Sequence, residues 1–365
     1  MDIQAYIMYG NLFRNGDILM QSKEKYRQLC TIEKDIPLFS QDWWMDAVCG
    51  EENWDVLVVE KDQRIIAALP YYLKKKIFLR CIVQPPFTTT HGIWLKYPPG
   101  QKYVQKLSYE REVISNIIKQ IDDLRVHVFM QDFHYSFTNW LPFAWNNFKQ
   151  TNRYTYILED LTNLASVFDS FKPAIRAEIR KAARRVTINE DCELETLYKL
   201  LQKSYERQKL PIPYKFEQLL RLDQVCRERK CRKILFAVDE QKNIHTACYF
   251  VWDETYVYYL LAGTDRLWRN SGANSLLVWE AIKMTAAMAK KFNFDGSSLE
   301  PIERFVSSFG GRQKPCFRIY RSKLLHTDLW DLYQHINKLK SMLFYYCRMP
   351  QGQNVNQRED NEVIL

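Results

Sequence analysis

The chain carries one short pattern twice, and this repeat restricts the folds open to it more than any other feature. Residues 56–72 and 235–251 each consist of an apolar run, a short charged turn and a second apolar run, which is typical of an antiparallel hairpin. In each half, strand-like sequence, a helix and another strand follow, with helices expected over Val104–Asp122 and Asn274–Lys291 and strands over Arg125–Gln131 and Phe292–Asp295. The pattern indicates two copies of one fold, unless a strand-turn-strand motif has recurred by chance.

The length of 365 residues is enough for two ordinary domains, each with its own core. We therefore predict two consecutive mixed α/β domains. In this division the first domain covers residues 1–160 and the second 161–325, followed by a C-terminal helix at 326–350 and a disordered polar tail at 351–365.

Composition excludes several classes of protein. Hydrophobic residues make up 47% and charged residues 26%, which is the balance of a globular protein. No apolar run approaches the roughly 18 residues of a membrane span, and no secretory signal is visible in residues 1–17. The nine cysteines are dispersed and the six histidines are isolated, so we expect free thiols in the cytoplasm and no metal site. The net charge of +9 suits an anionic partner such as nucleic acid, lipid headgroups or a phosphorylated molecule.

Residues 172–185 hold a dense group of cations. On a helix, four of these cations follow one another at four-residue steps, namely Lys172, Arg176, Arg180 and Arg184. Like charges at this spacing repel in an isolated helix, so the stripe needs a reason. Guanidinium groups suit phosphate, which indicates a binding site for a polyanion. The alternative is a solvated helix face that pairs with acids elsewhere in the chain.

A second feature is a strand-to-helix turn. The strand ends near Gly263, and after the glycine-containing loop 270–273 a helix is expected to begin near Asn274 or Ser275. Such a loop leaves backbone N–H groups free at a helix N-terminus, where an anion or a developing oxyanion can be held.

A third feature is a group of acids near the end of a short strand. The strand 292–295 delivers Asp295 to a Gly-Ser turn, and Glu300 and Glu303 follow. These carboxylates are candidates for accepting a proton from an attacking amine. The alternative gives Asp295 a turn-capping role and the glutamates a place on the surface.

These features, in this order, resemble the FemAB-like branch of the GNAT acyltransferase superfamily. The resemblance covers residues 26–319 and depends on the order of the motifs rather than on any one of them. The matching segments are Ile-Arg-Lys-Ala at 179–182, the strand at 259–262, the helix start at 274–282, Phe294-Asp295-Gly296, Phe305 with Phe309-Gly310, and residues 37–44 and 84–87. The resemblance implies two tandem GNAT-like domains, each a mixed twisted sheet flanked by helices.

The resemblance leaves the acyl donor open. FemAB peptidyltransferases take an amino acid from aminoacyl-tRNA and attach it to the peptide of a cell-wall precursor, whereas ordinary GNAT enzymes use acetyl-CoA. Val306 stands where the FemAB closing motif has lysine, with Arg304 nearby, and the helical insertion of some FemAB members is absent. Residues 269–274, in turn, fit the usual CoA pyrophosphate loop at all but the last position.

The function implied is N-acyl transfer to an amine of a cell-envelope precursor, with acyl-CoA or aminoacyl-tRNA as donor substrate and no tightly bound cofactor. The precursor would be phosphorylated or linked to a nucleotide or lipid, and the protein would lie in the cytoplasm or at the inner membrane surface, with tRNA as a partner if it supplies the donor. One alternative is an acetyl-CoA-dependent N-acetyltransferase of a small amine or amino sugar. Another is a tandem GNAT fold that binds RNA or a phosphorylated glycan without catalysis.

In this arrangement the acceptor is expected in a cleft of the first domain or at the junction, and the donor in the second domain. Polar, rigid loops after strands are usual places for ligand contacts, and the expected acceptor-binding residues are Trp43, Trp44, Gln84, Pro86, Thr88 and His91. The expected donor-binding residues are Tyr259, Arg269, Ser271, Gly272, Ala273, Asn274 and Ser275. The expected catalytic residues are Asp295, Glu300, Glu303 and Arg304.

Overall fold

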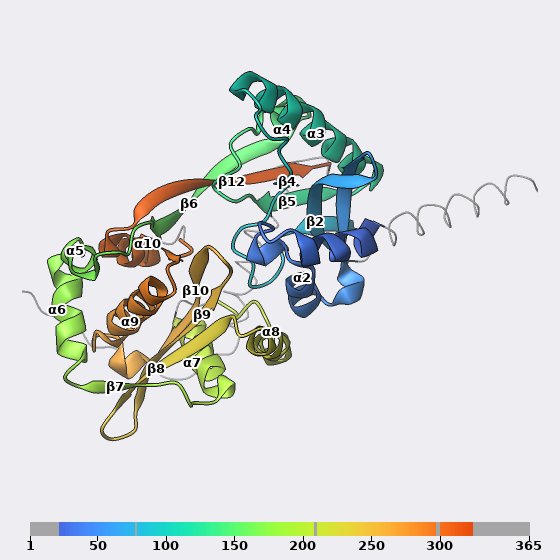
Figure 1. Cartoon of the computed structure of the whole chain (residues 1–365). Coiled ribbons are helices and arrows are strands. Elements are labelled where there is room, and N and C mark those ends of the chain that lie inside the picture. The colour runs from blue at the N-terminus through green and yellow to red at the C-terminus, as the bar shows by residue number, and fades with distance from the viewer. Residues whose placement is uncertain (1–21, 77–78, 208–209, 297–299, 324–365) are drawn as a thin grey trace, which may run out of the picture.

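The computed structural model describes residues 22–76, 79–207, 210–296 and 300–323. Within them, one twelve-stranded sheet runs through both halves of the chain, with helices packed against it (Figure 1). This architecture confirms the predicted mixed α/β class. The helix expected at 326–350 and the tail expected at 351–365 lie outside the described residues.

The elements follow one another in a simple order. The strands are β1 Trp54–Lys61, β2 Arg64–Lys76, β3 Leu79–Val83, β4 Trp94–Leu95, β5 Val128–Asp132, β6 Lys149–Leu158, β7 Val186–Asn189, β8 Arg232–Asp239, β9 Ile244–Trp252, β10 Tyr256–Thr264, β11 Lys291–Asn293 and β12 Arg312–Ser322. The α-helices are α2 Asp42–Cys49, α3 Tyr103–Asp123, α4 Leu141–Trp145, α5 Leu164–Asp169, α6 Pro173–Ala182, α7 Leu194–Arg207, α8 Phe216–Glu228, α9 Ala273–Ala287 and α10 Glu300–Val306, and residues 22–32 are also helical.

The repeat in the sequence is present in the structure. In the first half, β1, β2 and β3 are antiparallel neighbours, α3 follows, and β5 then runs parallel to β3. In the second half, β8, β9 and β10 are antiparallel neighbours, α9 follows, and β11 runs parallel to β10. Both predicted hairpins are confirmed. Asp62 and Gln63 make the first turn with positive φ angles of 50° and 61°, as a tight hairpin turn between twisted strands requires.

The two halves exchange a strand at the centre of the sheet. The central order is β5-β12-β6-β11, so the late strand β12 lies beside β5, and the early strand β6 lies beside β11. β6 and β12 pair with each other along most of their length and connect the two halves (Figure 1). The sheet is therefore continuous across residue 160, and the division into two domains at that position stays a prediction.

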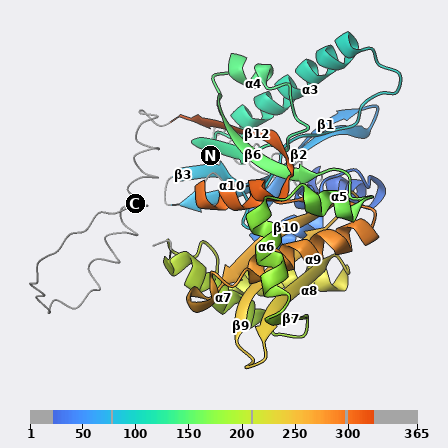
Figure 2. The ribbon, with the colours of Figure 1, turned by 90° about the vertical axis from the view of Figure 1, so that its left-hand side faces the viewer.

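Three hydrophobic cores hold the helices on the sheet. In the first half, α3 buries isoleucines spaced three or four residues apart, namely Ile114, Ile117, Ile118 and Ile121, which is the pattern of an amphipathic helix. In the second half, α6 and α9 lie side by side over β8 to β11 (Figures 1 and 2). A third core joins the halves, because α2, α7 and α8 share it and the rings of Phe39 and Tyr258 lie 4.7 Å apart.

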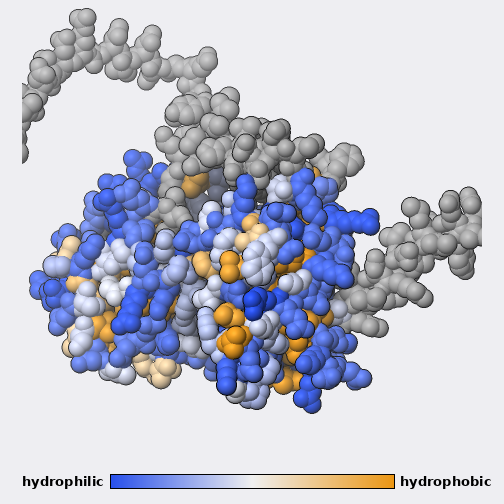
Figure 3. All heavy atoms as spheres, turned by 90° about the horizontal axis from the view of Figure 1, so that it is seen from above, coloured by the Kyte–Doolittle hydropathy of each residue, from blue (hydrophilic) through white to orange (hydrophobic). Residues whose placement is uncertain are grey.

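No helix in the described part of the chain is both long and apolar enough to cross a bilayer. Seen from above, the described surface is mostly hydrophilic, and its hydrophobic residues are scattered (Figure 3). Scattered exposed apolar side chains are ordinary for a globular protein.

One buried carboxylate joins the three central strands. Asp132 at the end of β5 accepts hydrogen bonds from Arg153 Nη1 on β6 at 2.7 Å and from Arg318 Nε and Nη2 on β12 at 2.6 and 2.8 Å. The Asp132 side chain is 3% exposed, and those of Arg153 and Arg318 are about one third exposed. Because the first half supplies two of these residues and β12 the third, the cluster holds the exchanged strand in register.

Replacing Asp132 with Asn should therefore lower the free energy of unfolding by roughly 2–4 kcal/mol, because two partly buried guanidinium groups would lose their counter-charge. The matched control is Asp122→Asn, which removes a carboxylate that pairs with Arg321 and Lys323 near the end of β12 but whose side chain is 42% exposed. That change should cost less than about 1 kcal/mol. Urea titrations of both variants measure the difference, and equal losses would contradict the role given to Asp132.

Candidate functional site

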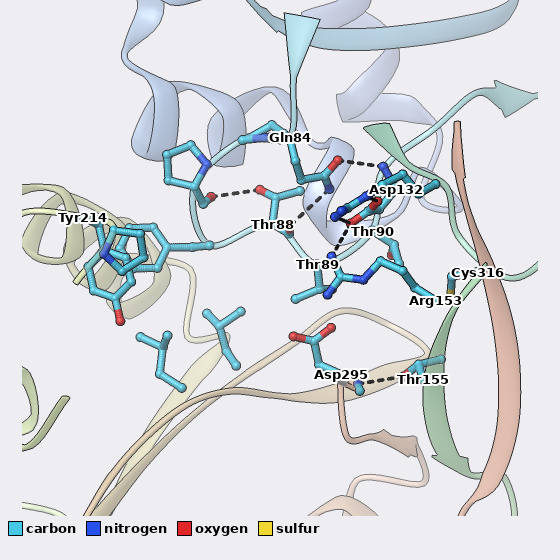
Figure 4. A pocket seen from close by; sticks show the side chains of 18 of the residues that line it. Gln84, Thr88, Thr89, Thr90, Asp132, Arg153, Thr155, Tyr214, Asp295 and Cys316 are labelled. Atoms are coloured by element: carbon cyan, nitrogen blue, oxygen red, sulfur yellow. Dashed lines mark hydrogen bonds and ion pairs between the residues drawn. The ribbon is translucent and has the colours of Figure 1, made fainter. Parts of the chain in front are cut away.

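A cavity of about 560 Å³ lies where the two halves of the sheet meet, and we call it the junction cavity (Figure 4). Loop 84–90 forms one wall, and side chains of β5, β6 and β12 form another. Asp295 and Gly296, which follow β11, face this loop, and Tyr205 and Tyr214 also line the cavity. Its size suits a small ligand or the end of a larger one.

Loop 84–90 is held rigidly by its own polar side chains. The Gln84 amide donates to the Thr88 carbonyl at 3.1 Å and accepts from the Asp132 backbone N–H at 2.9 Å. Thr88 donates its hydroxyl to the Pro86 carbonyl at 3.0 Å and accepts from the Trp44 indole N–H at 3.0 Å. Of the residues predicted to bind the acceptor, Gln84, Pro86 and Thr88 thus line the junction cavity, and the buried Trp44 supports them from behind.

Trp43 and His91, also predicted to bind the acceptor, do not line the junction cavity. Trp43 packs under the guanidinium of Arg229 at 4.6 Å. His91 is buried, and its Nδ1 lies 3.1 Å from the amide nitrogen of Gln131. Burial lowers the pKa of His91 to about 3, so this ring is neutral at physiological pH. Both side chains belong to the packing around the cavity rather than to its surface.

Three cations lie along one wall of the junction cavity. They are Lys74, Arg153 and Arg318, and Asp132 is the carboxylate that pairs with the two arginines. Since Asp132 accepts from both arginines, its charge offsets only part of theirs. The wall therefore favours a ligand that carries a carboxylate or phosphate group.

The turn after β11 places Asp295 in the cavity. Its backbone N–H donates to Asn293 Oδ1 at 2.9 Å, and Asn293 also accepts from the Thr155 hydroxyl of β6 at 2.5 Å. Asp295 has a positive φ of 51°, a strained conformation for a residue with a side chain. Gly296 is required next, because a Cβ there would lie 2.0 Å from the Tyr154 carbonyl. Contact with β6 thus fixes the direction in which the Asp295 carboxyl points (Figure 4).

The protein around Asp295 changes its acidity. Part of the residue faces the cavity, but protein surrounds the carboxyl group closely enough for burial to raise the pKa of Asp295 to about 7. A hydrogen bond with Thr89 and the charge of Arg153 oppose this rise. At neutral pH part of the group is therefore anionic, and this form can act as a general base.

A groove of about 500 Å³ joins the junction cavity from the second half, and we call it the β10–β11 groove. β10 and β11 pair only over Tyr256–Tyr258, where β11 ends, and β10 continues beyond this point to Thr264. A bulge in β10 leaves Leu260 opposite no residue of β9. The groove and the junction cavity share their linings at Tyr205, Tyr214, Leu260, Leu261, Asp295 and Gly296. Asp295 consequently stands where a ligand in the groove would meet one in the cavity.

Two of the residues predicted to bind the donor, Tyr259 and Asn274, line this groove. The Tyr259 hydroxyl donates to Asn274 Oδ1 at 3.0 Å, and burial raises the pKa of Tyr259. The other five predicted donor residues, Arg269, Ser271, Gly272, Ala273 and Ser275, lie around the N-terminus of α9 and outside the groove.

The helix α6 covers the N-terminus of α9. Gly272 precedes α9 with a φ of 77°, and a Cβ there would lie 2.7 Å from the Glu178 carbonyl. The Ser275 hydroxyl donates to the Glu178 carboxylate at 2.6 Å, and the Ala273 N–H donates to Ser271 Oγ at 3.3 Å. A carboxylate of the chain itself therefore already stabilises this helix end, where the sequence predicts a site for a donor anion.

The other residues predicted to be catalytic lie on α10, outside the junction cavity and the groove. Glu300 and Arg304 are exposed and pair with each other at 2.5 Å. Glu303 accepts a hydrogen bond from the Tyr156 hydroxyl of β6. Val306, at the position of the FemAB lysine, is buried and lines the groove with an apolar side chain. Among the four, the structure brings only Asp295 to the meeting point.

The predicted cationic stripe divides because α6 ends at Ala182. Arg176 pairs with Asp169 at 3.2 Å, and Arg180 lies over the Phe168 ring at 5.4 Å. Lys172 is the N-cap of the helix. Arg184 follows the helix end and lines a separate cavity together with Lys181 and Arg185.

Several cavity residues carried no local signal in the sequence. Asp132, Arg153 and Arg318 are single charged residues in strands, and only the pairing of β5, β12 and β6 brings them together. Lys74 belongs to a run of three lysines that reads as a solvated strand end. Tyr205 and Tyr214 come from α7 and the segment after it.

Comparisons with known proteins agree with this architecture. Residues 169–294 match the family model described as an acetyltransferase (GNAT) domain. The structure of FemX aligns with a TM-score of 0.60 at 11% identity, covering 85% of this chain and 98% of that one. The C-terminal domain of a putative lysylphosphatidylglycerol synthetase from Agrobacterium fabrum aligns with a TM-score of 0.51 at 9% identity, covering 82% and 92%.

A conserved protein of unknown function from Bacteroides thetaiotaomicron also aligns, with a TM-score of 0.51 at 10% identity over 83% of this chain and 97% of that one. No curated protein sequence matches. At these identities, the alignments show that this chain shares a fold with the solved structures, and they show no more than the fold. This chain therefore contains a GNAT acetyltransferase domain, at residues 169–294, within a fold like that of FemX.

Proposed function

We propose that this protein transfers an acyl group from an acyl-CoA to an amine of an anionic cell-envelope precursor. The acyl donor occupies the β10–β11 groove, and the amine reaches Asp295 through the junction cavity. The observation that carries the proposal is the place of Asp295, which lines both spaces and has a pKa raised to about 7.

In this reaction the amine nitrogen attacks the thioester carbonyl, a C–N bond forms, and the C–S bond breaks. The nitrogen gives its proton to the anionic Asp295 carboxylate, and the departing thiolate takes up a proton. Leu260 lines both the groove and the junction cavity, and it is the extra residue of the bulge in β10, so its backbone groups are free from the β9–β10 ladder. Its N–H is our candidate to stabilise the oxyanion.

The chemical class of the acceptor is inferred from the cations that line the junction cavity. Lys74, Arg153 and Arg318 outnumber Asp132 there, which supports an acceptor that carries carboxylate or phosphate groups beside its amine. The envelope as the source of that acceptor rests on the resemblance to the FemAB-like branch and on the shared fold with a domain of a putative lysylphosphatidylglycerol synthetase.

The choice of donor rests on the GNAT domain match, which supports an acyl-CoA. Neither the comparisons nor the groove support aminoacyl-tRNA, and we leave it out of the proposal. The same match supports an enzyme over a non-catalytic binding fold. A small amine or amino sugar remains the alternative acceptor, since a cavity of about 560 Å³ also suits a molecule of that size.

The first test is turnover with and without the Asp295 carboxylate. Purified protein should convert acetyl-CoA or a longer acyl-CoA to free CoA only when a suitable amine is present, in a panel of peptide precursors, amino sugars, amino sugar phosphates and uncharged amines. Asp295→Asn should lower kcat/KM by roughly 10²- to 10⁴-fold, because the general base is lost. Asn tolerates the positive φ at this position, so the turn should persist. Free CoA should be measured by chromatography and not with a thiol-reactive dye, because the eight described cysteines are free thiols and would also react with the dye.

The pH dependence tests the same role. In the wild type, kcat/KM should fall about tenfold per pH unit below a pH near 7, because protonated Asp295 cannot accept the amine proton. With an acceptor amine that is unprotonated across this pH range, any rate that remains in Asp295→Asn should lack this acidic limb. A variant that keeps the full rate and the same limb would exclude Asp295 as the base.

Stability against pH shows separately whether Asp295 is buried as described. Its folded pKa lies above its unfolded value of 3.8, so the wild type should lose stability as pH rises from about 4 through 7. Asn cannot ionise. In urea unfolding, the free energy of unfolding of Asp295→Asn relative to the wild type should therefore rise over this range, by at most about 4 kcal/mol and by less where the cavity admits solvent. A constant difference between pH 4 and 8 would contradict the raised pKa.

The cationic wall is tested by two neighbouring lysines. Successive residues of a strand point to opposite faces, and Lys74 lines the junction cavity whereas Lys75 does not. Lys74→Gln should raise KM for the anionic acceptor about three- to tenfold and leave KM for an uncharged amine unchanged. Lys75→Gln removes the same charge and should alter neither constant. Equal effects of the two changes would point to the net charge of the protein instead of the wall.

A further inference from the structure

We propose that a third cavity binds a phosphate ester on a hydroxyl-bearing ring, the chemistry shared by sugar phosphates and nucleotides. This cavity, which we call the basic cavity, has a volume of about 590 Å³ and lies between the end of α6, the β8–β9 turn and the loop before α9. Residues central to it are Lys181, Arg184, Arg185, His245, Trp268 and Ser271. None of its lining residues lines the junction cavity or the β10–β11 groove, so the proposal does not depend on the acyl transfer.

The three cations of the basic cavity form no ion pairs with the described residues. Within the described part of the chain, no carboxylate lies within 4 Å of Lys181, Arg184 or Arg185, whereas Arg176 on the same helix pairs with Asp169. A helix end attracts cations in its last turn, but Arg184 and Arg185 follow the end of α6 at Ala182. Three unpaired cations around one cavity point to an anion of more than one charge, and phosphate suits guanidinium groups best.

The acids of the same cavity do not supply those counter-charges. Asp239 accepts from the backbone N–H of Asn243 at 2.8 Å and from its side-chain amide at 2.9 Å. Its Oδ2 also lies 3.2 Å from His245 Nε2. Glu240 lies in the turn after β8, in an exposed position. The carboxylate of Asp239 is therefore committed to holding the β8–β9 turn and the histidine ring.

A buried histidine supplies the second, independent observation. His245 is 2% exposed, and its ring stacks on Trp268 with 4.1 Å between centroids and 6° between planes. With Nε2–H donating to Asp239, Nδ1 is left as an acceptor, and it has no hydrogen-bond partner among the described residues. The His245 ring lines the basic cavity, and a buried acceptor needs a partner, which a ring hydroxyl of a ligand supplies. The flat Trp268 ring beside it suits the face of a sugar or a base.

Calorimetric titration of the full chain with inorganic phosphate, glucose 6-phosphate and AMP tests this inference. Removing the cavity cations with Lys181→Gln, Arg184→Gln and Arg185→Gln together should weaken binding of the two ring phosphates at least about tenfold. The matched control removes three charges from the same helix outside the cavity, with Lys172→Gln, Arg176→Gln and Arg180→Gln, and should change the affinity less than about twofold. Circular dichroism melting curves check that both triple variants are folded.

A separate change tests recognition of the ring. His245→Phe keeps the stack on Trp268 but removes Nδ1, so it should weaken glucose 6-phosphate and AMP about three- to tenfold and leave inorganic phosphate unchanged. Tighter binding of glucose 6-phosphate would identify a sugar phosphate as the source, and tighter binding of AMP a nucleotide. The proposal is overturned if the wild type shows no saturable binding of either ring phosphate at millimolar concentration, or if both triple variants lose affinity equally.

Discussion

The carboxylate of Asp132 is the interaction on which the rest of this structure depends. It lies at the end of β5 and meets one arginine from β6 and one from β12, so three strands from distant parts of the sequence share one ionic cluster. Burying a charge is costly unless its partners are well placed, and here two guanidinium groups supply three hydrogen bonds. A one-residue slip of β12 would turn Arg318 to the other face and leave the cluster unbalanced. The exchange of strands between the halves and the register of the centre are thus specified together.

The same exchange builds the candidate site. Because β6 lies beside β11, Thr155 can reach Asn293 and the Tyr154 carbonyl can crowd Gly296, and these contacts aim Asp295 into the junction cavity. Because β12 lies beside β5, Arg318 faces the same cavity from the other side. Asp295 and Arg318 therefore come from the second half of the sequence, whereas Lys74 and Arg153 come from the first. Each half alone would contain a hairpin, a helix and a parallel strand, but only part of the cavity.

What the sequence predicted correctly was local, and what it missed was long-range. Hairpin turns, the isoleucine spacing of α3 and the strand end that carries Asp295 are patterns of neighbouring residues, which sequence periodicity reports directly. Arg153 and Arg318 are ordinary strand residues until β6 and β12 pair, so nothing nearby in the sequence marks them. The cationic stripe was predicted on the assumption that one helix continued through residue 185. It ends at Ala182, so Arg184 leaves the line of Arg176 and Arg180 and faces the basic cavity.

The contact between α6 and α9 limits how a donor can be held. A helix N-terminus attracts anions, but the Glu178 carboxylate already accepts from Ser275 in the first turn of α9, and the backbone of α6 leaves no room for a Cβ at Gly272. A second anion at this end would meet a like charge. The groove between β10 and β11, by contrast, is lined by Val306, Phe305 and Ile302 and leads to Leu260 and Asp295. An acyl chain gains free energy by burial there, at roughly 25 cal/mol per Å² of apolar surface. Donor binding in this protein is therefore expected to depend more on the acyl arm than on the phosphates, and a donor with a longer acyl chain should bind more tightly than one with a short chain.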